Sequence, residues 1–341
     1  MPTMRAIRYE RYGAPADVLQ LEVVDVPEPG EGEVLIRVQA ASANPVEWHF
    51  VRGEPFLVRL VAGLRRPNDA NVGGDVAGVV EAVGAGVTGL VEGDTVFGTA
   101  DGSFAEFACA KVGRLARKPQ AVTFVQAASI PVAGCTALQA LRDHGRLQPG
   151  QNVLVIGAAG GVGSFAVQIA KAGGAHVTGV CSTMHLDFVR ALGADTVVDY
   201  AREAPYGRYD LVIQLAGGTS VAHLRRLLTP HGTLVIVGAG AGRDGKGKML
   251  GPLPRILIGR TASRKDGQRV ATFIAKTRTP DLQALAALVE DGRIQPAVER
   301  TYPLEQAAAA LAQIETGHTR GKLVLTITNN SAPLRSARLR R

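Results

Sequence analysis

The chain has 341 residues, of which 46% are hydrophobic, and this is enough material for two domains with separate cores. Its formal charge is +8, but Arg335, Arg338, Arg340 and Arg341 lie in the last seven residues; without them, 34 basic residues face 30 acidic ones, a charge of +4. A body so mildly basic gives no reason to expect a nucleic-acid partner, and the tail 329–341 is expected to be disordered.

Neither a membrane span nor secretion is indicated. No stretch reaches the roughly 18 uninterrupted apolar residues of a span, and Met1–Arg5 lacks the apolar core of a signal peptide. A cytoplasmic protein is therefore expected. Cys109, Cys135 and Cys181 are widely spaced, without a Cys-x-x-Cys pair, so they are expected to be three buried thiols rather than disulfides or structural zinc ligands.

The first part of the chain is expected to be rich in short strands. Alternating or β-branched runs, separated by turns with Gly and Pro, predict these strands at 5–9, 33–40, 75–84 and 93–98. Such strands are typical of a compact barrel-like β domain.

From about Thr123 the pattern becomes helical, at 125–128 and 137–141, and then strands and helices alternate. Strands are predicted at 153–156, 176–180, 196–198, 210–213 and 232–237, and helices at 164–171, 186–192 and 221–228. This order is typical of a doubly wound parallel sheet of the Rossmann type, and the fold class is α/β. A mobile loop is expected at 238–251 and a sixth strand around 255–262.

The last part is expected to return to the first domain. Helices are predicted at 282–290 and 304–315, with Gln313 and Glu315 facing water, and a strand at 322–327. The predicted domains are a catalytic domain at 1–122, a cofactor-binding domain at 123–265, a returning segment at 266–328 and the basic tail at 329–341.

The most informative stretch is the strand Val153–Ile156 and the glycine-rich turn that follows it, before a helix. Gly160, Gly161 and Gly163 lack the Cβ atoms that would block a pyrophosphate or hold the helix away from the strand. The order strand, turn, helix therefore predicts a dinucleotide site made by the backbone of Ala159, Gly160, Gly161, Val162 and Gly163. The alternative is a glycine-rich turn in another kind of α/β unit.

Several short motifs in one order give the whole chain a family resemblance. They are Ala43-Asn44-Pro45-Val46-Glu47-Trp48, Gly73-Gly74-Asp75-Val76-Ala77-Gly78, Pro131-Val132-Ala133-Gly134-Cys135-Thr136-Ala137-Leu138, the glycine-rich turn, Leu192-Gly193-Ala194-Asp195, Arg300-Thr301-Tyr302-Pro303-Leu304 and Gly317-His318-Thr319-Arg320-Gly321-Lys322. With these motifs the chain resembles a medium-chain dehydrogenase/reductase of the zinc-free, quinone oxidoreductase-like branch. The resemblance implies a GroES-like catalytic domain, a Rossmann domain, a cleft between them and a homodimer.

No metal is expected. Zinc-dependent relatives carry a cysteine ligand at the position of Asn44 and a histidine at that of Gly74, and residues 97–107 contain no cysteine. If a metal were bound, Cys135 and Asp75 could serve as ligands. The competing interpretations are that Cys135 is a buried thiol and that Asp75 is a structural carboxylate. Without a Lewis acid, conjugated acceptors are favoured, because a quinone or an enone spreads the charge left by hydride addition.

Three residues are candidates for the chemistry. The resemblance places Asn44 and Thr136 beside the nicotinamide and its ribose; the alternatives are an Asn-Pro turn for Asn44 and a helix N-cap for Thr136. His49 lies five residues after Asn44, where zinc alcohol dehydrogenases have a proton-relay histidine, and its alternative is a packing role. Phe56 stands about where some enoyl reductases carry a tyrosine donor.

The end of the second Rossmann strand favours NADPH. An NAD-binding enzyme usually has an acidic residue there, but this chain has Cys181-Ser182-Thr183-Met184-His185. Ser182, Thr183, His185 and Tyr200 are expected to bind the 2′-phosphate. Relatives often carry arginine at Met184, so use of NADH stays open. The resemblance adds Gly238 and Lys322 to the cofactor site.

The sequence therefore predicts an enzyme, an NADPH-dependent, zinc-free oxidoreductase that transfers a hydride to a quinone or an α,β-unsaturated carbonyl. One alternative is an enoyl reductase of a single biosynthetic pathway. The other is a catalytically silent NADPH-binding protein that acts as a redox sensor or scaffold.

Overall fold

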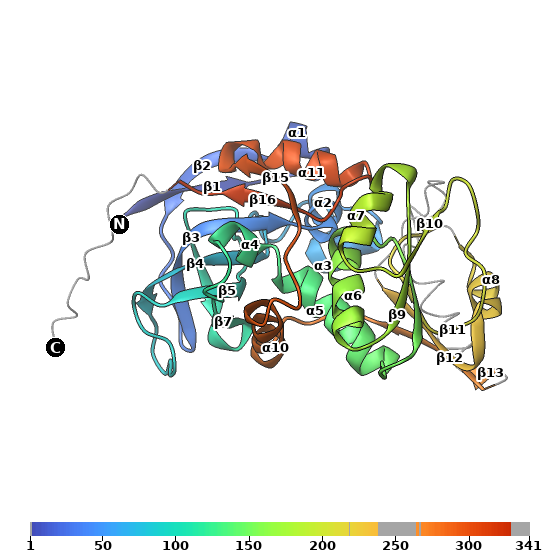
Figure 1. Ribbon diagram of the computed structural model, residues 1–341. Helices are drawn as coiled ribbons and strands as arrows, with labels where there is room; N and C mark the ends of the chain where they lie inside the picture. The colour runs from blue at the N-terminus through green and yellow to red at the C-terminus, as the bar shows by residue number, and fades with distance from the viewer. Residues whose placement is uncertain (1, 218, 238–263, 266, 329–341) are drawn as a thin grey trace.

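The computed structural model describes residues 2–217, 219–237, 264–265 and 267–328. Two large sheets lie side by side, with helices α5 (Pro131–Gln139), α6 (Gly161–Ala172) and α10 (Thr279–Glu290) in the middle of the molecule (Figure 1). Gly238, the loop expected at 238–251, the strand expected at 255–262 and the tail 329–341 lie outside the described residues.

The first sheet is built from both ends of the chain. Its strand order is β15-β16-β3-β4-β5-β7, and β6 pairs with β3. β16 runs antiparallel to β3, with Leu323 opposite Ala43, and Figure 1 shows the red β15 and β16 near the blue β3. The strand predicted at 322–327 therefore does return to the first domain. The strands are β3 (Glu33–Ala43), β4 (Asp75–Val83), β5 (Thr95–Thr99), β6 (Phe107–Lys111), β7 (Leu115–Arg117), β15 (Val298–Pro303) and β16 (Lys322–Thr326).

Smaller elements cover this sheet. β1 (Thr3–Arg8) and β2 (Gln20–Asp25) form a separate hairpin, and the short helices are α1 (Pro15–Val18), α2 (Pro45–Arg52), α3 (Leu57–Ala62), α4 (Phe124–Ala128) and α11 (Ala307–Glu315). α11 packs against α1, α2 and β16. The prediction that Gln313 faces water is wrong, since Gln313 is half-buried and accepts a hydrogen bond from the hydroxyl of Tyr302, whereas Glu315 is exposed.

The second sheet has the Rossmann arrangement that the sequence predicts. Its order is β10-β9-β8-β11-β12-β14-β13, parallel except for β13 against β14. β8 lies inside the sheet and is buried on both faces, which explains its unbroken aliphatic run. The elements are β8 (Asn152–Ile156), β9 (His176–Cys181), α7 (Leu186–Ala191), β10 (Thr196–Asp199), β11 (Tyr209–Gln214), α8 (Val221–Arg226), β12 (Leu228–Val237), β13 (Arg264–Lys265) and β14 (Gln268–Phe273).

The domain boundary predicted at residue 266 is too early. β14 pairs in parallel with β12, with Thr233 opposite Arg269, so Gln268–Phe273 belongs to the Rossmann sheet and not to the returning segment. The chain returns to the first domain after β14. β13 runs antiparallel to β14, with Lys265 opposite Gln268.

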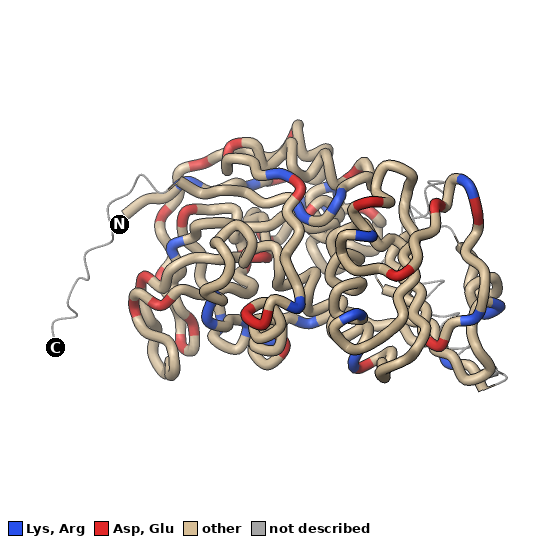
Figure 2. The backbone as a smooth tube through the Cα atoms, in the orientation of Figure 1, with Lys and Arg blue, Asp and Glu red and all other residues tan. Residues whose placement is uncertain are grey.

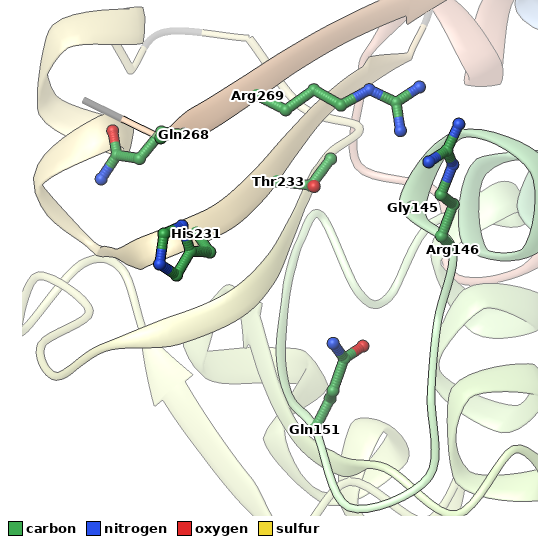
Figure 3. A pocket seen from close by; sticks show the side chains of 8 residues that line it. Gly145, Arg146, Gln151, His231, Thr233, Gln268 and Arg269 are labelled. Atoms are coloured by element: carbon green, nitrogen blue, oxygen red, sulfur yellow. The ribbon is translucent and has the colours of Figure 1, made fainter. Parts of the chain in front are cut away.

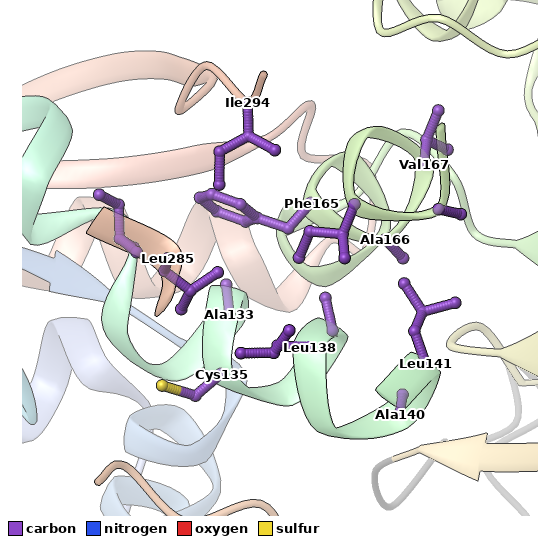
Figure 4. Close-up of a cluster of buried hydrophobic side chains, with 14 of the residues drawn as sticks. Ala133, Cys135, Leu138, Ala140, Leu141, Phe165, Ala166, Val167, Leu285 and Ile294 are labelled. Carbon is purple, nitrogen blue, oxygen red and sulfur yellow. The ribbon is translucent and has the colours of Figure 1, made fainter. Parts of the chain in front are cut away.

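One apolar cluster spans the two domains, and further clusters lie within each domain alone. Figure 4 shows Phe165 of α6 above Ala133 and Leu138 of α5, with Leu285 of α10 and Ile294 beside them. Phe165 is fully buried, and burial of such a side chain stabilises a fold by ~1.5–3 kcal/mol. The junction between the domains is therefore held by packing on both sides of α5.

The cysteines are free thiols, as predicted, but only two of the three are buried. Cys135 and Cys181 are buried, while Cys109 is half-buried on β6. Burial raises the pKa of Cys135 to about 12, so its thiol stays protonated at neutral pH.

Candidate active site

The glycine-rich turn forms an open helix N-terminus. α6 begins at Gly161 with Gly160 in extended conformation, and among the described residues no side chain caps it. A Cβ on Gly163 would lie 2.1 Å from the carbonyl oxygen of Gly157, so helix and strand are as close as glycine allows. Uncapped N–H groups at a helix start are an anion-binding arrangement, and these residues fit a dinucleotide pyrophosphate.

The returning strand closes one side of this turn. The Gly321 N–H donates to the Ala159 carbonyl oxygen over 2.8 Å, and Gly160 and Gly321 form a parallel bridge. A Cβ on Gly161 would lie 2.8 Å from Cδ of Lys322. The structure thus brings Lys322, some 160 residues further along the chain, against the predicted phosphate site.

Four polar side chains meet beside the turn, and we refer to Asn44, Glu47, Asp75 and Lys322 as the junction cluster. The Lys322 ammonium donates to Oδ1 of Asn44 and to the carbonyl oxygen of Ala43, the latter over 3.1 Å, and its Nζ lies 3.5 Å from Oδ2 of Asp75. All four side chains are buried; Lys322 is 4% exposed. A lysine this deeply buried requires partners of opposite charge, and Asp75 is one of them.

Asn44 is the most heavily bonded member of the junction cluster. Its Nδ2 donates to Oδ2 of Asp75 over 3.0 Å and to the carbonyl oxygen of Ser42 over 3.3 Å, while its Oδ1 accepts from Lys322. Its backbone N–H donates to Oε2 of Glu47 over 2.8 Å at the start of α2. Asn44 therefore stands directly before the first residue of α2, and its side-chain amide is fixed in one orientation.

Burial dominates the electrostatics of the two carboxyl groups. It raises the pKa of Glu47 to about 7, and the charge of Asp75 acts in the same direction. Burial also raises the pKa of Asp75, although Lys322 and the hydrogen bonds from Asn44 and Val132 stabilise its ionised form. The junction cluster therefore holds two acids for one ammonium, and a proton is the natural compensation.

His49 lies on α2 beside the only tryptophan of the chain. Its Nδ1 is 2.7 Å from the carbonyl oxygen of Glu54, and its ring stacks on Trp48 with the ring centres 3.8 Å apart. Burial lowers the pKa of His49, so the neutral ring prevails at pH 7. In that state Nδ1 carries the proton that it donates to Glu54, which leaves Nε2 for another partner.

Thr136 lies on the helix that faces the junction cluster. Its hydroxyl donates to the carbonyl oxygen of Val132, 2.6 Å away and one turn earlier in α5. The capping alternative is wrong, because α5 begins at Pro131 and Thr136 lies in its second turn. The Val132 N–H donates to Oδ1 of Asp75 over 2.9 Å, so α5 holds both Thr136 and a contact to the junction cluster.

The expected 2′-phosphate site contains a carboxylate that the sequence reasoning did not find. Asp199 ends β10, directly beside Cys181 at the end of β9, and it accepts a hydrogen bond from the hydroxyl of Thr183. This hydrogen bond and one from the Ala201 N–H hold the pKa of Asp199 below its usual range. The inference that no carboxylate stands here was wrong, because the next parallel strand supplies one.

The neighbouring residues differ in exposure. Met184 is 74% and Tyr200 47% exposed, and Ser182 is half-buried. Both ring nitrogens of His185 are buried and lack a hydrogen-bond partner among the described residues. An imidazole left in this state fits a site that is completed by a polar ligand.

A hollow of about 500 Å³ lies elsewhere on the second domain. Figure 3 shows Arg146 and Arg269 converging on it, with Gln151, His231 and Thr233 around it. Gln151 precedes β8, and Thr233 pairs with Leu211 early in β11, so the hollow is at the amino end of the parallel strands. The glycine-rich turn follows the carboxyl end of β8, so this hollow is separate from the predicted cofactor site.

Comparisons with known proteins agree with this geometry. Residues 30–120 match the family described as alcohol dehydrogenase GroES-like domain, and residues 192–325 the family described as zinc-binding dehydrogenase. The chloroplast envelope quinone oxidoreductase homolog of Arabidopsis thaliana is 33% identical over 340 residues, 94% of this chain and 98% of that protein. The chain belongs to the quinone oxidoreductase-like medium-chain dehydrogenases/reductases.

Two further similarities extend along most of the chain. The mitochondrial NAD(P)H oxidoreductase of Bos taurus is 33% identical over 329 residues, 86% of this chain and 82% of that protein. The solved quinone oxidoreductase of Coxiella burnetii is 31% identical and superimposes with a TM-score of 0.83, covering 96% of this chain and 100% of the other. This member of the family is an oxidoreductase that uses a nicotinamide cofactor.

In this quinone oxidoreductase-like enzyme, the positions of the zinc ligands of its relatives carry Asn44 and Gly74. Within the described ranges, no three His, Cys, Asp or Glu side chains are grouped so as to hold a metal ion. Among the helices in the same residues, none is long and apolar enough to cross a membrane.

The sequence reasoning missed Glu47 and Asp199 as site residues. Both had a signal: Glu47 is the third residue after an Asn-Pro helix start, where an acid reaches back to the N-cap, and Asp199 ends a parallel strand beside the cofactor edge. The sequence suggests Asp75 only as a possible metal ligand or a structural carboxylate, whereas in the structure it accepts a hydrogen bond from Asn44 and approaches Lys322.

Proposed function

We propose that this enzyme reduces quinones or α,β-unsaturated carbonyl compounds with NADPH, at the junction of its two domains. The observation that carries the proposal is the contact of Lys322 with Gly161, since it joins the predicted phosphate turn to the junction cluster. NADH is the second candidate cofactor. The carboxylate of Asp199 beside Thr183 favours this second use, because it weakens the positive character of a 2′-phosphate site.

The bound dinucleotide supplies the hydride, and the protein supplies position and hydrogen bonds. We assign the backbone of Ala159 to Gly163 to the pyrophosphate, and Ser182, Thr183, His185 and Tyr200 to the adenosine end. Gly238, outside the described residues, stays part of the predicted cofactor site. Lys322 supports the turn with its methylene groups, while its ammonium is bonded within the junction cluster.

Asn44, Thr136 and His49 stay the proposed residues for the chemistry. The amide of Asn44 and the hydroxyl of Thr136 donate to protein partners, so their orientations are fixed at the proposed nicotinamide position, and Oγ1 of Thr136 keeps lone pairs that can accept from a ribose hydroxyl. His49 is the proposed proton relay, through Nε2. Apolar groups of Phe56, Leu60 and Val61 are exposed next to α2, which suits an apolar conjugated acceptor.

Turnover of a panel of acceptors by the purified protein tests the proposal. We expect NADPH oxidation with quinones and enones, and much slower reaction with simple aldehydes and ketones. Tight NADPH binding without turnover of any acceptor would favour the redox sensor or scaffold, and activity restricted to one acyl-type enone would favour the pathway-specific enoyl reductase.

Assembly and partners stay predictions. Figure 2 shows Lys and Arg interspersed with Asp and Glu over both domains, and we propose a small-molecule acceptor and no nucleic-acid partner. Light scattering on the purified protein tests the expected homodimer. A fluorescent fusion tests the expected cytoplasmic location, since two of the relatives have chloroplastic or mitochondrial names.

A further inference from the structure

Glu47 is a buried acid that the proposed reaction does not use. It lies on the first turn of α2 with 7% of its surface exposed, and its Oε1 would be 3.4 Å from a Cβ on Gly74. A carboxyl group in such a place is either compensated by donors or protonated. The donors around the junction cluster show which of these applies.

The two carboxyl groups of the junction cluster are unequally supplied with donors. Asp75 accepts from the Val132 N–H over 2.9 Å and from Asn44 Nδ2 over 3.0 Å, and it faces Lys322. Glu47 accepts from the Asn44 N–H over 2.8 Å and has a long contact of 3.4 Å with Asn44 Nδ2. Asp75 is therefore the better stabilised anion, and Glu47 is the group that takes a proton.

Among the described residues, no charged group other than Lys322 compensates Glu47. Besides Asp75 on β4 and Lys322 on β16, the elements packed against α2 carry Asp17 on α1, Arg59 on α3 and Glu315 on α11. Arg59 lies over the ring of Tyr12, and Glu315 pairs with Arg52. Asp17 is exposed, and on α2 itself Nδ1 of His49 is bonded to Glu54.

The junction cluster is also next to the predicted phosphate site. The methylene chain of Lys322 lies over Gly161, the first residue of α6, while its ammonium reaches Asn44 and Asp75. The carboxyl groups of Glu47 and Asp75 share the single ammonium of Lys322. An anion at the start of α6 therefore adds further negative charge close to these two carboxyl groups. Like charges at short range favour the protonated acid.

We propose that Glu47 is a positioning residue that takes up a proton when the anionic dinucleotide binds and releases it when the dinucleotide leaves. The inference rests on the proposed cofactor site. Burial raises the pKa of Glu47 to about 7, so both of its states are populated near neutral pH. With Glu47 neutral, one ammonium balances one carboxylate beside the phosphates; with Glu47 ionised, the junction cluster adds a net negative charge that opposes binding.

The test compares NADPH affinity across pH in the wild type, in Glu47→Gln and in Glu22→Gln, a control that removes an acid from the surface pair with Arg8. Dissociation constants are measured by fluorescence titration at pH 6, 7, 8 and 9. We expect the dissociation constant of the wild type, divided by that of Glu47→Gln, to rise about tenfold from pH 6 to pH 9. This rise corresponds to a pKa of Glu47 that increases by about one unit when the dinucleotide binds. The 2′-phosphate of the ligand titrates equally with each protein, so the ratio isolates Glu47.

The inference would be overturned if the ratio for Glu47→Gln stayed constant with pH. It would also be overturned if the wild-type dissociation constant divided by that of Glu22→Gln rose by the same factor. If Glu47→Gln does not fold, calorimetry of the wild type in buffers of different ionisation enthalpy gives the answer directly. We expect uptake of about half a proton per dinucleotide near pH 7.5 with NADH as well as NADPH. Binding without uptake refutes the role of Glu47, whereas absence of binding by either dinucleotide refutes the proposed function.

Discussion

The glycine-rich turn and the junction cluster are neighbours that are built in opposite ways. The turn is one stretch of backbone, Gly157–Gly163. Its shape requires glycine, because a Cβ atom on Gly163 would collide with the neighbouring backbone. The junction cluster consists of side chains from β4, β16, α2 and the residue before α2, which are up to 278 residues apart in the chain. The shape of the turn is thus set by its own glycines, while the junction cluster depends on the register of the whole first sheet.

This difference has an energetic counterpart. Loss of glycine in the turn introduces a steric conflict at one place, whereas loss of one charge in the junction cluster leaves its partner buried and uncompensated. Mutations in the two regions should therefore be separable by their dependence on pH. Only the junction cluster contains groups that titrate.

Lys322→Met should break the junction cluster and have the largest effect. It leaves Asp75 buried without its ammonium, and we expect the free energy of unfolding to fall by about 3–5 kcal/mol at pH 8. The loss should be smaller at pH 5, where the carboxyl groups, whose pKa values burial raises, take up protons. Urea denaturation at both pH values measures this, and Lys322→Met with Asp75→Asn should recover most of the loss. A small, pH-independent loss would contradict the electrostatic role.

Gly163→Ala should break the turn with a smaller effect on stability. Its Cβ would lie 2.1 Å from the Gly157 carbonyl oxygen, and we expect about 1–3 kcal/mol of destabilisation that does not vary with pH. Gly160→Ala is the matched control, because its Cβ would lie 3.6 Å from the same atom. Thermal unfolding should separate the two variants, while NADPH titration should show weaker binding in both. Equal stability of the two would disprove the steric account.

His49→Gln tests the proposed relay at the edge of the junction cluster. Burial lowers the pKa of His49, so its acidic form is populated only toward low pH. If His49 donates protons to the acceptor, the ratio of wild-type to variant kcat should rise to about tenfold as pH falls from 8 to 6. A ratio near one at every pH, with a lower Tm, would assign His49 to packing on Trp48.

Met184→Arg sharpens the cofactor assignment and should have the smallest effect. Met184 is exposed beside Ser182 and Thr183, so an arginine there would place charge next to a 2′-phosphate. We expect the ratio of kcat/KM for NADPH to that for NADH to rise about threefold to fivefold, a surface ion-pair effect of less than ~1 kcal/mol. An unchanged ratio would place the phosphate elsewhere, and Asp199→Asn should shift the ratio in the same direction as the arginine.

The sequence predicted the two-domain architecture, the parallel sheet and the glycine-rich turn before α6. A strand, a glycine-rich turn and a helix are local features, and the aliphatic run of β8 follows from burial on both faces. The junction cluster was not predictable in the same way. Each of its members Asn44, Asp75 and Lys322 lies in one of the family motifs. Their contact, however, follows from the pairing of β16 with β3 and of β3 with β4. The contact of Asp199 with Thr183 was not predictable for the same reason, because Asp199 lies on a neighbouring strand.

The return of the chain to its first sheet also has a consequence for biosynthesis. β3 cannot pair with β16, nor can Ala159 accept the hydrogen bond from Gly321, until Gly321 and the strand after it have been synthesised. Contacts of such long sequence separation slow folding and leave a strand edge unpaired on the ribosome. The first sheet of this protein is thus completed after the second one has been synthesised, and its two halves join only when β16 has emerged.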